Sequence, residues 1–191
     1  MNLPNKLTTL RLIMIPVFIA VFYVDFPYHY LVAAVVFALA AFTDFLDGYF
    51  ARKLNLVTNL GKFLDSSADK VLVLAALCVM IDSHLLPFVW GGIAASIVIA
   101  REIMISCLRM IAAGKGVVMA ADKLGKIKTF LQDVSIFLIL LSFGFFPEAS
   151  FPSAMNVVYA IGLALFALSV VMALVSGVNY VIVNRKVLTE N

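Results

Sequence analysis

The chain has 191 residues, of which 64% are hydrophobic and 13% charged, with a net charge of +3 and a mean hydropathy of +1.09. An ordinary soluble domain is about 45–50% apolar, so this composition excludes a water-soluble globular protein. A bilayer core about 30 Å thick is crossed by about 20 apolar residues. The length therefore allows about six spans in a single transmembrane domain, residues 1–191.

Apolar runs separated by polar interruptions predict an all-α protein with six transmembrane helices. They are expected at 7–24, 30–53, 62–82, 87–112, 128–146 and 154–184. The first run is longer than a signal-peptide core, so no cleavage is expected. Turns around Pro27, Pro87 and Pro147 break the pattern at one end of the helices, and 53–61 and 113–127 break it at the other. An even number of spans places both termini on one side.

The distribution of cations predicts the orientation in the membrane. Lysine and arginine are enriched in short cytoplasmic loops. None of the 14 Lys and Arg residues falls in the three proline-containing turns, and most lie toward the opposite end of the predicted helices. We therefore expect that end and both termini to face the cytoplasm, with the protein in the cell membrane.

Four aspartates interrupt the second and third predicted helices: Asp44, Asp47, Asp65 and Asp69. Together they cost on the order of 10 kcal/mol to insert in a membrane, which argues for a function. Helical spacing puts each pair on one face of its helix, and the turn at 53–61 predicts that the two helices are antiparallel neighbours. Clustered carboxylates suit Mg²⁺ or Mn²⁺, which are often held together with substrate phosphates. The sequence therefore predicts a divalent-metal site for a phosphorylated substrate.

Small residues accompany these acids at Gly48, Ala51 and Gly61. Such residues let membrane helices pack closely. They also leave room for a ligand to lie against the backbone, and both interpretations stay open.

The pattern Asp44-x2-Asp47-Gly48-x2-Ala51-Arg52-x8-Gly61-x3-Asp65-x3-Asp69 resembles the complete signature of the CDP-alcohol phosphotransferase family, with eight fixed positions over 26 residues. The resemblance implies a six-helix homodimer with a polar cavity open to the cytoplasm, where a CDP-linked donor binds two divalent cations. It implies that Asp44, Asp47 and Asp65 bind metal and that Asp69 is the general base, near the second metal. It also implies a donor site that includes Asp44, Asp47 and Asp65 and is bordered by Asn5, Gly48, Ala51, Arg52 and Gly61.

Basic residues outside this signature are predicted to bind the acceptor. Arg101 and Arg109 lie in the fourth predicted helix, and Lys126 and Lys128 lie where the fifth begins. Arginine grips phosphate bidentately and lysine acts as a point charge, so these cations suit a phosphate dianion. Helical spacing puts Glu102, Ser106 and Arg109 on one face and Lys126, Thr129 and Asp133 on another. Two alternatives stay open: a Glu102–Arg109 salt bridge, and lysines that only set the orientation.

Three segments, Asn5 to Arg11, Arg101 to Arg109 and Gly125 to Thr129, are similar to those of bacterial phosphatidylglycerophosphate synthases. The resemblance implies transfer of a phosphatidyl group from CDP-diacylglycerol to sn-glycerol 3-phosphate, in anionic phospholipid biosynthesis. The predicted acceptor-binding residues are Thr9, Arg11, Arg101, Arg109, Lys126 and Lys128.

Other acceptors stay open as alternatives, namely inositol phosphate or phosphatidylglycerol. A divalent-cation transporter is a rival of another class, because intramembrane acids also mark ion pathways. A transporter would not need small residues interleaved with the acids beside a basic pocket. No nucleic-acid partner is expected.

Overall fold

The structure is a computed structural model that describes residues 3–53, 59–114, 123–144 and 153–183. Within these ranges the side chains at 3–7, 44–53, 59–66, 69, 88, 123 and 153–156 lie outside the description. The described residues form six α-helices. Their bounds are Leu3–Tyr23 for α1, His29–Lys53 for α2, Asn59–Asp82 for α3, Phe88–Gly114 for α4, Lys123–Gly144 for α5 and Ser153–Val183 for α6.

The six predicted helices are confirmed, with differences at their ends. Helix α1 begins at Leu3 rather than at residue 7. Pro4 lies in its first turn, where the missing N–H would have no intrahelical partner. Helix α5 begins at Lys123 rather than at residue 128, so Gly125 lies inside the helix. A glycine costs a helix only about 1 kcal/mol and therefore does not end it.

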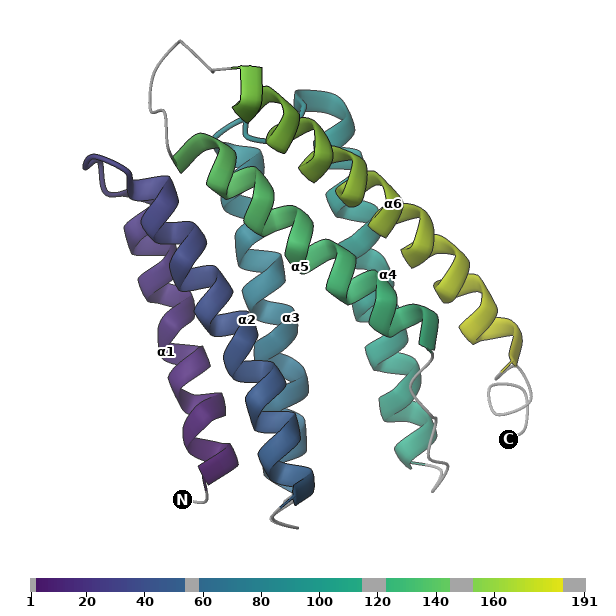
Figure 1. The fold of residues 1–191 in the computed structure, drawn as a ribbon. Coiled ribbons are helices and arrows are strands. Elements are labelled where there is room, and N and C mark those ends of the chain that lie inside the picture. Colours follow the sequence, from purple (N-terminus) through teal and green to yellow (C-terminus); the bar gives the residue numbers. More distant parts are fainter. Residues whose placement is uncertain (1–2, 54–58, 115–122, 145–152, 184–191) are drawn as a thin grey trace.

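Consecutive helices run in alternating directions, and the start of α1 and the end of α6 lie toward the same end of the bundle (Figure 1). Helix α1 packs along α2, and α5 packs along α6. Helix α5 also contacts α2, and α4 contacts both α6 and α3. Helices α2 and α3 are antiparallel and contact each other, as predicted. The last turns of α2 and the first turns of α3 thus share one end of the bundle.

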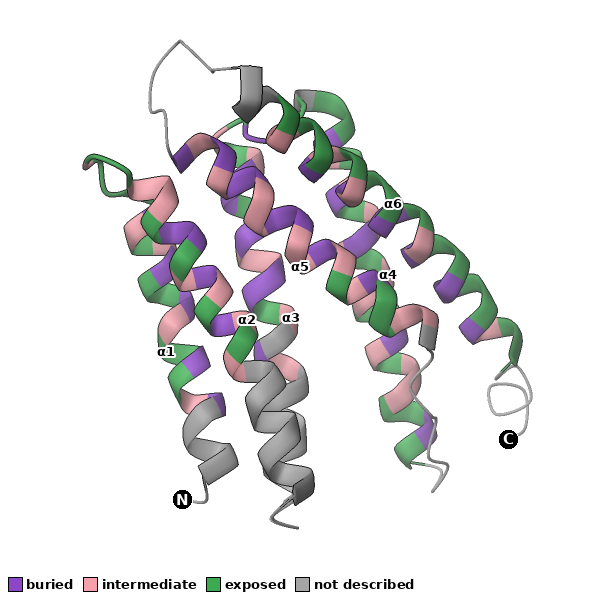
Figure 2. Cartoon of the chain, viewed as in Figure 1, coloured by how far each residue is buried: buried purple, intermediate pink, exposed green. Residues whose placement is uncertain are grey.

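The interior is formed by aromatic and aliphatic side chains, and many large apolar side chains face outward. Phe18, Phe37 and Ile136 are fully or almost fully buried. Exposed positions recur along the length of α6 (Figure 2), where Val171, Leu174, Val175, Val178 and Ile182 are exposed. In the described part of the chain, three helical segments are long and apolar enough to cross a membrane: Val89–Gly114, Leu124–Gly144 and Val157–Val183. Shorter apolar segments are Thr8–Tyr23 and His29–Thr43. These features are those of a membrane protein.

Glycines allow close approach where helix α5 meets its neighbours. A Cβ added at Gly144 would lie 2.6 Å from the backbone of Leu31 in α2. A Cβ added at Gly162 in α6 would lie 2.8 Å from Ile139 in α5. Real Cβ atoms do not come this close to other atoms, so glycine is needed at both crossings.

Candidate active site

The predicted metal and donor residues lie on the two antiparallel helices. Asp44 and Asp47 belong to α2, and Asp65 and Asp69 belong to α3. The helical backbone spaces each pair by about one turn, as predicted. Their side chains lie outside the described residues, as do those of the predicted donor residues Asn5, Gly48, Ala51, Arg52 and Gly61. Among the described side chains, no group of three His, Cys, Asp or Glu residues could hold a metal. The convergence of the four carboxylates stays a prediction.

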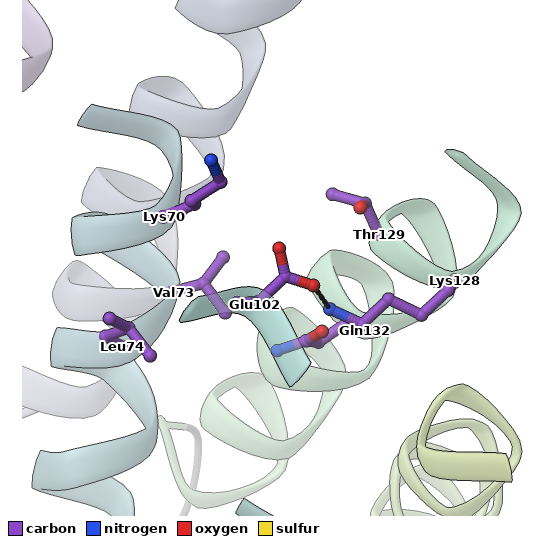
Figure 3. Close-up of a pocket in the computed structure, with 7 residues that line it drawn as sticks. All are labelled: Lys70, Val73, Leu74, Glu102, Lys128, Thr129 and Gln132. Carbon is purple, nitrogen blue, oxygen red and sulfur yellow. Dashed lines mark hydrogen bonds and ion pairs between the residues drawn. The ribbon is translucent and has the colours of Figure 1, made fainter. Parts of the chain in front are cut away.

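A polar pocket lies directly beyond the last aspartate of the signature, between helices α3, α4 and α5. Its cavity volume is about 10 Å³, and it opens into a space of about 270 Å³ between the side chains when open solvent is included. Its lining residues are Lys70, Val73, Leu74, Glu102, Lys128, Thr129 and Gln132. In Figure 3, Lys70 and Lys128 come from opposite sides, with Glu102 and Gln132 between them. Lys70 follows Asp69 in the chain, which connects this pocket to the signature.

An ion cluster forms one wall of the pocket. Lys128 Nζ donates a hydrogen bond to Glu102 Oε1 at 2.6 Å, and Arg101 Nη1 donates to the same oxygen at 2.9 Å. The side chains are well enclosed, with 2% of Lys128, 11% of Arg101 and 15% of Glu102 exposed. Two cations and one anion leave the cluster with a net charge of +1. A low dielectric strengthens these contacts and leaves the surplus charge able to attract an anion.

Helix α6 holds the two arginines of α4. Arg101 Nη2 donates to Ser176 Oγ at 2.8 Å. Arg109 Nε donates to Tyr180 Oη at 3.1 Å, and the guanidinium carbon lies 5.4 Å from the centre of the same ring. The salt bridge that the sequence allowed between Glu102 and Arg109 is therefore wrong, because Glu102 pairs with Arg101 and Lys128. The sequence did not indicate Ser176 and Tyr180 as partners of these arginines, because both are uncharged residues within a long apolar segment.

The two lysines at the start of α5 have different surroundings. Lys126 is exposed, whereas Lys128 is 1% exposed. Two residues correspond to about 200° around a helix, so the two side chains leave α5 on opposite sides. Lys126, Thr129 and Asp133 share one face of the helix, as predicted, and of these three only Thr129 is among the described lining residues of the pocket.

The remaining acceptor-binding predictions fall on helix α1. Arg11 is fully buried and Thr9 is half-buried. Neither is among the described residues that line the pocket between α3, α4 and α5. The structure therefore places Lys128 in the lining of this pocket and ties Arg101 to it through Glu102, whereas Thr9 and Arg11 are not among its described lining residues.

Sequence reasoning missed Gln132. It lines the pocket and is only 1% exposed. Neither its Oε1 nor its Nε2 has a hydrogen-bond partner among the described residues. Its position four residues after Lys128 places both on one face of α5, and this spacing could have identified it. A buried amide with both polar atoms unsatisfied is costly, which marks the position as a place for a ligand or water.

Comparison with known proteins adds to this geometry. The family model described as CDP-alcohol phosphatidyltransferase matches residues 1–175. A protein of Bacillus subtilis (strain 168) is 44% identical over 165 residues, which cover 80% of this chain and 83% of the relative. A protein of Escherichia coli (strain K12) is 39% identical over 181 residues, covering 94% of this chain and 92% of the relative.

Both relatives bear the name CDP-diacylglycerol--glycerol-3-phosphate 3-phosphatidyltransferase, as does a Salmonella typhimurium protein that is 40% identical over 181 residues, with the same coverage as the Escherichia coli protein. A family match over most of the chain and relatives at this identity agree with the aspartate signature in α2 and α3. The chain belongs to the CDP-alcohol phosphatidyltransferase family.

Proposed function

We propose that this protein is an enzyme that transfers the phosphatidyl group of CDP-diacylglycerol to sn-glycerol 3-phosphate, giving phosphatidylglycerophosphate and CMP. The names of its relatives support this reaction. The structural observation that carries the acceptor assignment is the buried ion cluster beside the signature helix, whose net charge of +1 comes from Arg101, Lys128 and Glu102. A pocket of this charge favours an acceptor that bears a phosphate over a neutral alcohol.

The reaction is a displacement at phosphorus. The 1-hydroxyl of glycerol 3-phosphate attacks the lipid-side phosphorus of the donor, one P–O bond forms, and the P–O bond to CMP breaks. Asp69 accepts the proton of the attacking hydroxyl. Arg101 and Lys128 hold the acceptor phosphate, aided by Arg109, and so fix the hydroxyl in line with the leaving group. Arg11, Thr9 and Lys126 are further proposed contacts of the acceptor.

The aspartates fit a pair of divalent cations. Carboxylate oxygens are the ligands that Mg²⁺ and Mn²⁺ prefer, and helices α2 and α3 space the acids one turn apart on two contacting elements. Asp44, Asp47 and Asp65 would hold the cations, with Asp69 beside the second. When bound, the cations supply charge neutralisation for the diphosphate. Gly48, Ala51, Arg52, Gly61 and Asn5 would border the CDP group.

We place all six helices of the single domain across the cytoplasmic membrane. The described end of the bundle that carries Arg109, Lys126 and Lys128 would face the cytoplasm, by the preference of cations for that side, and both termini would lie there. A polar cavity would open on that side. The acyl chains of the donor would stay in lipid between helices. A homodimer is proposed from the family resemblance alone.

The test is an acceptor screen with detergent-purified protein, CDP-diacylglycerol and Mg²⁺ or Mn²⁺. We expect CMP release with glycerol 3-phosphate and a product with the mass of phosphatidylglycerophosphate. A chelator should abolish release, and excess metal should restore it. Preferential use of inositol phosphate or phosphatidylglycerol would overturn the acceptor assignment, and absence of CMP release with all acceptors would overturn the transferase assignment.

A further inference from the structure

The unsatisfied amide of Gln132 lies at the wall of the pocket, next to the ion cluster. Its side chain is almost fully buried, and neither polar atom finds a hydrogen-bond partner in the described part of the chain. Figure 3 shows it beside the Lys128–Glu102 pair. We propose that Gln132 is a specificity-determining residue that hydrogen-bonds a hydroxyl group of a phosphorylated polyol held in this pocket, an inference that rests on the proposed function.

The chemistry of the amide defines the group that it binds. The NH₂ of glutamine only donates hydrogen bonds and its carbonyl oxygen only accepts them. A phosphate dianion has acceptors alone, so it would satisfy the NH₂ and leave the carbonyl oxygen unpaired. A hydroxyl group both donates and accepts, so it can satisfy either atom and is the natural complement of the pair. The pocket thus offers cations for a phosphate and an amide for a hydroxyl.

The positions of Lys128 and Gln132 assign a different part of the acceptor to each residue. Lys128 and Gln132 are one helical turn apart on α5, and Lys128 is tied to Glu102 of α4 at 2.6 Å. A phosphate held at Lys128, on the side of the pocket that carries the ion cluster, therefore brings the adjacent carbons of a short polyol to Gln132. In sn-glycerol 3-phosphate the 1-hydroxyl is consumed in the reaction. The 2-hydroxyl is the group that remains available to Gln132.

The experiment compares two acceptors that differ only in this hydroxyl: glycerol 3-phosphate and 1,3-propanediol monophosphate. Both carry a phosphate and a reactive primary hydroxyl. We expect the unmodified protein to prefer glycerol 3-phosphate in kcat/KM by about tenfold or more, since a site built for a hydroxyl rejects the analogue that lacks it. Gln132→Leu should lower kcat/KM for glycerol 3-phosphate by about tenfold and leave the analogue almost unchanged. The preference should therefore collapse.

Matched variants separate recognition from folding. Ser142→Ala removes another buried polar group of α5, whose Oγ donates to the carbonyl of Ile139 outside the pocket, and it should keep the full preference. Gln132→Met serves as a second apolar variant if leucine prevents folding, because its unbranched side chain fits the same space. An equal loss on both acceptors, or an unchanged preference in both apolar variants, would overturn the role of Gln132. Absence of CMP release by the unmodified protein with either acceptor would instead overturn the proposed function, and this inference with it.

Discussion

Glu102 pairs with two enclosed cations from two helices, and its replacement by glutamine tests whether the ion cluster supports the fold. Glu102→Gln keeps an oxygen that can accept from Lys128 Nζ but removes the negative charge. The charge of the cluster then rises from +1 to +2 in a site where only 2% of the Lys128 side chain is exposed. Removing one partner of a buried ion pair costs about 3–5 kcal/mol, and the retained hydrogen bond places the expected loss of unfolding free energy near the lower value, about 3 kcal/mol.

A second substitution tests whether the unpaired charge on Lys128 causes the loss of stability in Glu102→Gln. Lys128→Met removes the charge that Glu102→Gln leaves without its partner. The double variant should therefore lose less stability than the sum of the two single variants, by about 1–3 kcal/mol. Two independent effects would instead add.

The measurement is equilibrium unfolding in a mild detergent with added dodecyl sulfate, followed by circular dichroism. Asp25→Asn is the control, because it removes a carboxylate from an exposed turn and should change the unfolding free energy by less than about 0.5 kcal/mol. If Glu102→Gln were as stable as the control, or if the double variant lost the full sum, the ion cluster would not be a coupled stabilising unit.

Three further predictions concern the aspartate signature, Arg109 of α4 in its contact with α6, and the helix crossings. Asp65→Asn should abolish CMP release without removing the protein from the membrane, and near-normal turnover with Mg²⁺ or Mn²⁺ would contradict its role as a metal ligand. Arg109→Lys keeps a cation but loses the contact with Tyr180, so kcat/KM for glycerol 3-phosphate should fall by about tenfold. Lys126→Gln removes an exposed cation whose contact with the acceptor is weakened by solvent, so kcat/KM should fall by only about threefold, and the reverse order would contradict the placement. Gly144→Ala should lower the unfolding free energy by about 1–3 kcal/mol, because its Cβ would meet the backbone of Leu31. Gly92→Ala is the control and should not be destabilising, because a Cβ there meets no atom within 4 Å. Equal losses of unfolding free energy in the two variants would contradict the close crossing.

The helices were predictable because the bilayer imposes their length, and every predicted helix is present. Their ends were less predictable. The stretch 113–127, which contains Gly125, was expected to break the helical pattern, but α5 already begins at Lys123. Local glycine preference is weak compared with the need to satisfy backbone hydrogen bonds in an apolar setting.

The charged residues of the candidate site could be predicted, because a charge in an apolar segment is costly and therefore conspicuous. The contacts between them could not be predicted, because they depend on the tertiary structure. Arg101 and Lys128 stood out as cations in apolar sequence, and the structure places both at one carboxylate. Which cations share a carboxylate depends on the orientation of α4 about its own axis relative to α5. This orientation cannot be derived from a single sequence. Gln132 and Tyr180 were not predicted because they are uncharged. Gln132 nevertheless lines the pocket, and Tyr180 accepts a hydrogen bond from Arg109.

The family match ends at residue 175, one residue before Ser176 and five before Tyr180. Those two side chains hold the arginines of α4 from the last turns of α6, just past the end of the family-model match. A chimera that joins α1–α5 of this protein to a final helix without a serine and a tyrosine at these two positions would inherit the signature yet lose both supports. Grafting only a serine and a tyrosine at the equivalent positions should restore them, so the last helix is exchangeable between relatives only together with these two residues.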